Sequence, residues 1–411
     1  IERVARDAGR ARQHHLVCMD MLRTLYGEHA MGHAERVAQH AIAAGELEAA
    51  LDPLIDASYH EQVSGRYIAA EETLLRYEMV LEALSISQDD IRWARGQVQR
   101  FWLDWTRGGA DEDLRHHVEE LAELAESRGW EEILGECWRW RGLVARFEEG
   151  ASASLSHLER ARKHYAAIGD EEGQARCLLS MAVALRSLRS LERAQACLVQ
   201  AVELASKSDF FVLLPRCFGN LAEVSLQLGD FDRAEERFAR AEQVAADVGD
   251  RKALAFAVGG QGELALARGD LDLAAAKWSQ AETIFSAVGS SYARVARVHL
   301  ATILAARGSL DEGYRLISRV FERGPLRDPL ARAIAHLTLA ACAGSRGNWS
   351  GLGGWDEHVD LAVEELAETQ EARHVLALAA NLAGEIAAHA GMEQRARQAN
   401  ALIRVIKPLA Q

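Results

Sequence analysis

Apolar residues recur every three or four positions through most of the chain, which is the spacing of amphipathic helices. The clearest stretch, residues 216–250, reads RCFGNLAEVSLQLGDFDRAEERFARAEQVAADVGD and predicts two helices joined by a turn at Gly229-Asp230. Glycine permits the left-handed conformation that ends a helix, and the aspartate after it can cap the next one. The pattern therefore predicts antiparallel helical hairpins.

The rest of the chain divides in the same way. We expect lead-in helices over 2–27 and 29–44, so that residues 1–45 form a lead-in or linker region before a helical array over 46–411. The array would contain about nine helix pairs, near 46–84, 88–128, 131–168, 171–206, 211–247, 251–288, 291–323, 328–368 and 371–408. The glycine-rich stretch 344–354 breaks the period and is interpreted as an insertion that lengthens one turn, with a hinge as the alternative.

A period of 40 residues runs through the middle of the chain. Small residues recur at three positions of the period: Gly142, Ala182, Ala222 and Gly262; Ser154, Ala194, Ala234 and Ala274; Ala161, Ala201, Ala241 and Ala281. Small side chains are needed where neighbouring helices approach to about 8–10 Å. A hairpin of this kind cannot bury its apolar face alone, so the hairpins are expected to stack.

Cysteines follow the same period. Cys137, Cys177 and Cys217 are spaced by 40 residues, and Ala257 stands at the next step. Such spacing predicts one small buried position in successive repeats, which a free thiol can fill. We therefore expect reduced core thiols rather than disulfides or metal ligands, and a cytoplasmic location.

The repeat resembles the tetratricopeptide repeat (TPR). The residues that carry the resemblance are Gly229-Asp230-Phe231 with Ala234 and Ala241, and Gly269-Asp270-Leu271 with Ala274 and Ala281. The unit at Arg189-Ser190-Leu191 lacks the glycine. The resemblance implies an all-α fold, a right-handed superhelical solenoid, in the long-repeat form attached to bacterial signal-transduction (STAND) ATPases, large LuxR-type regulators and kinase–ATPase–TPR proteins.

A second, shorter resemblance concerns residues 38–46, AQHAIAAGE, which are similar to a segment that follows the ATPase module in large LuxR-type regulators. It implies that the chain is a piece of a longer protein with an NTPase or kinase domain upstream. The chain itself contains no GxxxxGK[ST] phosphate loop.

Composition and charge limit the classes of partner that this chain is expected to bind. The 411 residues are 49% hydrophobic and 26% charged with only 5 prolines, which indicates a folded helical protein. The net charge of −14 repels polyanions, so nucleic acid is not expected as a partner. No apolar run reaches the about 20 residues of a membrane span, so no membrane partner is expected either.

Motifs for catalysis and metal binding are missing. Neither a G-x-S-x-G elbow nor HExxH occurs, so we expect no enzymatic activity and no cofactor. His29 and His33 are spaced as a zinc-chelating pair on one helix face, with His40 further along. No third ligand accompanies them, so a packed or solvated helix without metal is the preferred interpretation.

The resemblance also implies which residues face the concave groove, because the first helix of each pair lines that surface in the family. These positions are Arg139, Arg146, Arg176, Arg186, Arg216, Asn220, Glu223 and Glu263. Arginines there would bind an anionic segment, unless glutamates and aspartates of neighbouring helices neutralise them. Arg216 and Asn220 resemble half of a carboxylate clamp, but Gly260 replaces the matching asparagine of the next repeat.

Six tryptophans lie between residues 93 and 140: Trp93, Trp102, Trp105, Trp130, Trp138 and Trp140. They are expected to thicken the core between the second and third helix pairs. Trp138 and Trp140 share a helix but point in different directions, so we expect Trp140 to be the one exposed on the groove.

Two functions fit these features. The first is a non-catalytic sensor module of a bacterial signalling protein, which binds a peptide, protein segment or small effector in a groove walled by Arg139, Arg176 and Arg216. The alternative is a constitutive structural scaffold or self-association platform without a small ligand. An extended apolar patch on the convex face or at one end would favour the second.

Overall fold

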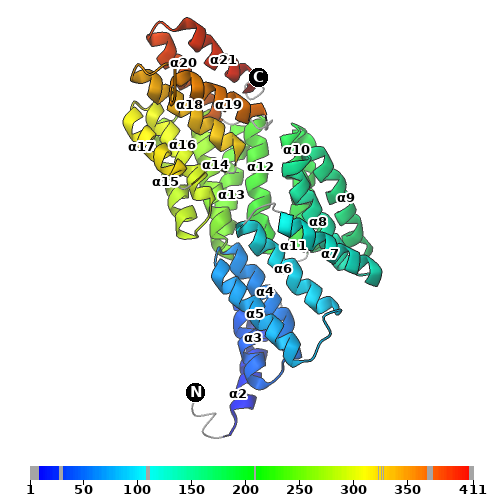
Figure 1. Cartoon of the computed structure of the whole chain (residues 1–411). Coiled ribbons are helices and arrows are strands. Elements are labelled where there is room, and N and C mark those ends of the chain that lie inside the picture. Colours follow the sequence, from blue (N-terminus) through cyan, green and yellow to red (C-terminus); the bar gives the residue numbers. More distant parts are fainter. Residues whose placement is uncertain are drawn as a thin grey trace. The chain divides into compact units, whose positions relative to one another are not determined.

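The structure is a computed structural model that describes residues 9–26, 31–107, 112–207, 210–322, 324, 326, 328–367 and 374–406. Regular structure in these ranges is helical throughout, which confirms the predicted all-α architecture (Figure 1). None of the described helices combines the length and the hydrophobicity needed to cross a bilayer.

The chain divides into two compact units, Ile1–Ser180 and Met181–Gln411. The first contains α2 (Ala11–Tyr26), α3 (Met31–Ala44), α4 (Leu51–Val63), α5 (Tyr67–Ala83), α6 (Ile91–Arg107), α7 (Glu112–Arg128), α8 (Glu131–Glu148) and α9 (Ala151–Ala167). The division falls within α10 (Glu171–Ser187). The predicted boundary at residue 45 stays a prediction.

The second unit continues with α11 (Leu191–Lys207), α12 (Leu214–Gln227), α13 (Phe231–Val248), α14 (Arg251–Ala267), α15 (Leu271–Ala287), α16 (Tyr292–Ala306), α17 (Leu310–Phe321), α18 (Pro329–Ser345), α19 (Trp355–Ala367), α20 (His374–His389) and α21 (Glu393–Ile406). Helices of a predicted pair pack together, as α12 does with α13 and α14 with α15. First helices of adjacent pairs also touch, as α12 does with α14 and α16 with α18. The hairpins therefore stack as the repeat predicts.

The predicted turn chemistry is present. Gly229, Gly249 and Gly269 adopt φ values of 77°, 75° and 80°, the left-handed region that ends a helix. Asp230 and Asp270 then cap the next helix by accepting hydrogen bonds from the backbone amides of Arg233 and Leu273. Where the glycine is lost, Arg189 itself takes a φ of 59°. The local geometry of the turn is thus kept even without the residue best suited to it.

The small-residue positions lie at close helix contacts, as predicted. Ala161, Ala201, Ala241 and Ala281 are at most 1% exposed, as are the residues at the Ser154 position of the period. A Cβ on Gly142 would come within 2.7 Å of Leu158 Cγ, so α8 and α9 approach too closely there for a side chain. Cys137, Cys177 and Cys217 are completely buried free thiols, which confirms the shared core position.

The connection between α18 and α19 is a folded turn. The backbone amide of Asn348 donates to Ala343 O, and those of Trp355 and Asp356 donate to Asn348 O and Trp349 O. The Trp349 ring packs against the core beside Trp355. These contacts favour the insertion interpretation of residues 344–354 over the hinge.

Candidate functional site

A buried ion cluster connects α8 and α10 in the first unit. The guanidinium of Arg139 donates two hydrogen bonds to Glu136 Oε2, with Nη2 at 2.7 Å and Nε at 3.0 Å. Arg176 reaches the other carboxylate oxygen, with Nη1 at 3.1 Å from Glu136 Oε1. Glu136 and Arg139 have side chains only 6% and 3% exposed. Arg139 and Arg176, two arginines of the predicted groove, therefore share the charge of one glutamate.

Electrostatics keep Glu136 ionised. Burial by itself raises the pKa of this carboxyl, but the charges of Arg139 and Arg176 more than offset it, and the pKa falls to about 2. The phenol of Tyr165 lies beside the same carboxylate and also lowers its pKa. The result is a charged cluster fixed inside the helical stack.

Aromatic rings enclose this cluster. The Arg139 guanidinium carbon lies 5.6 Å from the centre of the Trp102 ring and 5.4 Å from that of Trp140. Trp140 is completely buried and packs against Phe101, Trp102 and Trp105 of α6. The expectation that Trp140 is exposed on the groove is therefore wrong, because the rings of α6 cover it. The core between the second and third helix pairs is thickened by tryptophans, as predicted.

Trp138 takes the more open position instead. It is partly buried, stacks on His157 at a centroid distance of 5.5 Å, and lies under the guanidinium of Arg141. Arg146, another predicted groove residue, lies 4.3 Å from the centre of the Phe147 ring. Neither arrangement adds to the Glu136 cluster.

Arg216 in the second unit is also paired with a carboxylate. Its guanidinium Nε donates to Asp250 Oδ2 at 3.3 Å, and Asp250 is completely buried. The other oxygen of Asp250 accepts the backbone amide of Ala253 at 2.8 Å, so Asp250 caps α14 as well. Burial and the charge of Arg216 lower the pKa of the neighbouring Lys252, Asp250 opposes both, and the resulting pKa is about 8.

Arg186, near the end of α10, contacts Asn220 and Glu223 of α12. Arg186 Nη1 is 3.4 Å from Asn220 Oδ1 and 3.7 Å from Glu223 Oε2. The Asn220 amide donates to the carbonyl of Arg216 one turn earlier at 2.9 Å. Side chains of Arg186 and Glu223 are 11% and 18% exposed, so both are partly accessible to a partner.

Two histidines near Glu263 extend this group of polar side chains. Glu263 on α14 is 2% exposed, and its oxygens lie 3.8 Å from Nδ1 of His299 and 3.8 Å from Nδ1 of His374. His374 begins α20, which packs against α14 and α16. Burial lowers the pKa of His374, and the charge of Glu223 opposes this. We call the row of polar side chains formed by Arg186, Asn220, Glu223, Glu263, His299 and His374 the first-helix wall.

Arg216 and Asn220 resemble half of a carboxylate clamp, and the structure explains why the other half is missing. A Cβ on Gly260 would lie 2.1 Å from Cε1 of Phe238, because the Phe238 ring of α13 occupies that space. No side chain fits there without moving the ring. Asn220 itself is turned toward its own helix.

Several members of these clusters were missed in the sequence. Asp250 could have been predicted from the sequence, because it stands at the helix-capping position that recurs in the repeat. Glu136 lies one turn before Arg139, which favours an ion pair on one helix face. His299 and His374 carried no signal, because their approach to Glu263 depends on how α16 and α20 pack.

The structure describes only some of the histidines that were considered as a zinc site. His29 lies outside the described residues. His40 pairs with His15, their Nδ1 atoms being 2.9 Å apart. Within the described ranges, no three His, Cys, Asp or Glu side chains are grouped to hold a metal ion.

Comparison with known proteins establishes the fold. No protein-family model and no curated protein matches the chain. Among solved structures, a Rap protein complexed with Competence and Sporulation Factor is similar at 17% identity and a TM-score of 0.64, over 87% of this chain and 98% of that one. NprR in complex with its cognate peptide NprX matches at 13% identity and a TM-score of 0.56, over 86% and 97%.

A third similar structure is the Rap conjugation gene regulator of plasmid pLS20 in complex with the Phr* peptide. It has 15% identity and a TM-score of 0.54, over 87% of this chain and 97% of that one. At such identities the likeness is one of fold. The chain is thus a TPR-like helical solenoid, as its repeat pattern predicted.

Proposed function

We propose that this chain is a non-catalytic binding module whose first-helix wall recognises a peptide or protein segment. The observation that carries the proposal is the row of buried and partly buried polar groups from Arg186 to His374, contributed by the first helices of five different hairpins. The fold likeness to three proteins, one solved with Competence and Sporulation Factor and two with a peptide, supports this choice of ligand.

The chemistry of the wall suits a segment with both polar and charged groups. Among the described residues, the polar contacts of Arg186 are long, at 3.4 Å and 3.7 Å, so its guanidinium can turn to a partner carboxylate at small cost. Glu223 on the same surface can accept from backbone amides or a basic side chain. A short peptide offers both groups, a terminal or side-chain carboxylate for Arg186 and backbone amides for Glu223.

The cellular setting of the proposal follows the sequence resemblance. The module would belong to a cytoplasmic bacterial regulator, downstream of an NTPase or kinase domain whose state the bound segment biases. A small effector is an alternative ligand for the same wall. One structure of similar fold is an aspartyl phosphate phosphatase, but this sequence contains no catalytic motif to support such an activity.

The test is peptide selection on the purified chain, followed by affinity measurements with a charge-balanced double variant. Arg186→Gln with Glu223→Gln removes one positive and one negative charge from the wall. The matched control is Glu192→Gln with Arg193→Gln, two exposed residues of α11. Selected peptides should lose about tenfold or more in affinity for the wall variant, since each charge-assisted contact is worth about 1.5–3 kcal/mol. Peptides that bind both variants equally well would remove the wall from the mechanism.

A scaffold remains the second candidate, and two exposed apolar stripes favour it. Val17, Met21 and Leu25 form one on α2, with exposed fractions of 55%, 50% and 64%. Ile68, Leu75 and Met79 form another on α5, at 77%, 48% and 66%. Scattering-detected gel filtration of Met21→Ser and Met79→Ser variants tests this role. A scaffold that self-associates would lose mass in these variants, whereas an unchanged monomer would leave only the binding role.

A further inference from the structure

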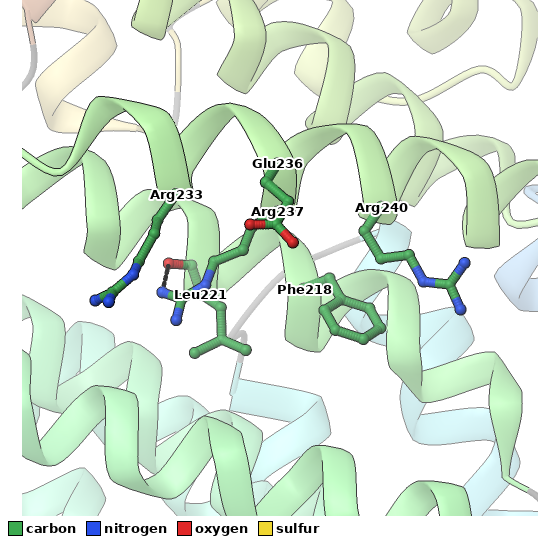
Figure 2. Close-up of a pocket in the computed structure, with 6 residues that line it drawn as sticks. All are labelled: Phe218, Leu221, Arg233, Glu236, Arg237 and Arg240. Carbon is green, nitrogen blue, oxygen red and sulfur yellow. Dashed lines mark hydrogen bonds between the residues drawn. The ribbon is translucent and has the colours of Figure 1, made fainter.

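A cavity of about 320 Å³ opens between α12 and α13 in the second unit. Its lining consists of Phe218, Leu221, Arg233, Glu236, Arg237 and Arg240. The three arginines leave α13 on one side and share that side with the Phe218 and Leu221 side chains (Figure 2). Spacings of four and three residues place them along one face of the helix.

Arg237 is held in place by neutral acceptors. Its Nη1 donates to the backbone oxygen of Leu221 at 3.2 Å and to Ser225 Oγ at 2.5 Å. Burial lowers the pKa of this guanidinium, and the positive charge of Arg233 lowers it further. The side chain is thus a fixed cation that an approaching anion would stabilise.

Arg240 completes the positive side of the cavity. Its guanidinium carbon lies 5.9 Å from the centre of the Phe218 ring, and the side chain is exposed. Within the described part of the chain, neither Arg237 nor Arg240 forms an ion pair with a carboxylate. Arg233 lies 3.3 Å from Asp230, the capping residue of the same helix.

Three arginines discussed above differ from Arg237 and Arg240, because each of them contacts a carboxylate. Arg139, Arg176 and Arg216 each lie within 3.3 Å of a carboxylate oxygen. Three arginines against one lining carboxylate, Glu236, give the cavity a positive balance in a chain of net charge −14. Such a local field attracts small anions.

We propose that this cavity binds a small organic anion, a carboxylate or phosphate monoester attached to a flat apolar body. Arg237 and Arg240 would hold the oxyanion, with Arg233 at the edge, while the apolar body lies on Phe218 and Leu221. Guanidinium groups match carboxylate and phosphate oxygens in geometry, and an aromatic floor favours a planar ligand. The site is separate from the first-helix wall and does not depend on the function proposed for it.

The test measures binding of phenyl phosphate, benzoate and inorganic phosphate to the full chain by calorimetry and ligand-observed NMR. Phenyl phosphate or benzoate should bind at least about fivefold more tightly than inorganic phosphate, because only the aromatic probes contact Phe218. The better of the two identifies the oxyanion that the site prefers. If no aromatic probe binds at 10 mM, or inorganic phosphate binds equally well, the proposal is overturned.

Variants localise the binding. Arg240→Gln should weaken the aromatic probes by about tenfold, since one charge-assisted contact is lost. Arg193→Gln on exposed α11 is the matched control and should leave binding within about twofold. Arg237→Gln adds a second test if its circular dichroism is unchanged, because Arg237 also bonds the fold. Equal loss in the Arg240 and Arg193 variants would show nonspecific charge attraction and refute the site.

Discussion

Arg176 Nη1 lies 3.1 Å from Glu136 Oε1, and this contact joins the first helices of two adjacent hairpins, α8 and α10. The same carboxylate binds Arg139, so one buried negative charge serves two buried or partly buried positive ones. Charge complementarity thus adds a specific polar contact to a helical stack otherwise held by small apolar residues. Arg139 and Arg176, two of the predicted groove arginines, thus contact a carboxylate of the protein itself.

Loss of the Glu136 charge should destabilise the chain. In Glu136→Gln, Arg139 and Arg176 would lose the carboxylate charge that they share, at a cost of about 3–5 kcal/mol. Urea unfolding followed by tryptophan fluorescence measures this, since Trp102 and Trp140 lie in the same cluster. Glu123→Gln on the exposed face of α7 is the control.

The same variant has a defined pH dependence. Because the pKa of Glu136 is lowered from 4.5 to about 2, its contribution to stability is complete above pH 4.5 and is lost as the pH falls toward 2. The stability difference between the wild type and Glu136→Gln should therefore shrink between pH 7 and pH 3. An equal difference at both values would contradict the ionised cluster.

Overpacking one repeated small position should cost stability where the neighbouring helix is close. Ala241 is 1% exposed, so Ala241→Leu should reduce the free energy of unfolding by about 1–3 kcal/mol. Ala239→Leu, on the exposed side of the same helix, should change it by less than about 0.5 kcal/mol. Thermal unfolding of both variants checks this, and equal melting temperatures would mean that the repeat register is misplaced.

Lys252 should titrate near pH 8. Burial and Arg216 lower the pKa of its amine to about 8, below the 10.5 of an ordinary lysine. Between these values the unfolded chain binds the extra proton, so stability should rise with pH across that window. NMR titration of the ¹³C-methylated amine measures the pKa directly. Arg216→Gln should raise it, since a positive neighbour is lost and Asp250 is released; an unchanged value would refute this arrangement.

Thiol reactivity should separate the buried cysteines from those that are partly exposed, Cys18 and Cys197. Burial raises the pKa of Cys137, Cys177 and Cys217 to about 12, and none of the three is exposed. At pH 8 a maleimide should modify the partly exposed Cys18 and leave those three intact until urea is added. Peptide mass mapping reads each site, and fast native labelling at Cys177 would contradict the shared core position.

The hairpins could be predicted from the sequence because the interactions that form them are local. Gly229 and Asp230 end one helix and begin the next through backbone conformation and a single hydrogen bond, both of which a short sequence specifies. The period of small residues such as Ala241 likewise reports a contact that every repeat makes in the same way. Helices, turns and core positions were therefore predictable from spacing alone.

Side-chain partners were decided by the packing of helices that lie far apart in the sequence. The pattern placed Arg139 and Trp140 on one helix, but the rings of α6 determined that both are covered. His374 meets Glu263 only because α20 packs on α14, and the arginines of α13 form a cavity only with Phe218 and Leu221 of α12. Periodicity specifies which face of a helix is buried, whereas the identity of the facing residue depends on the three-dimensional contact between helices.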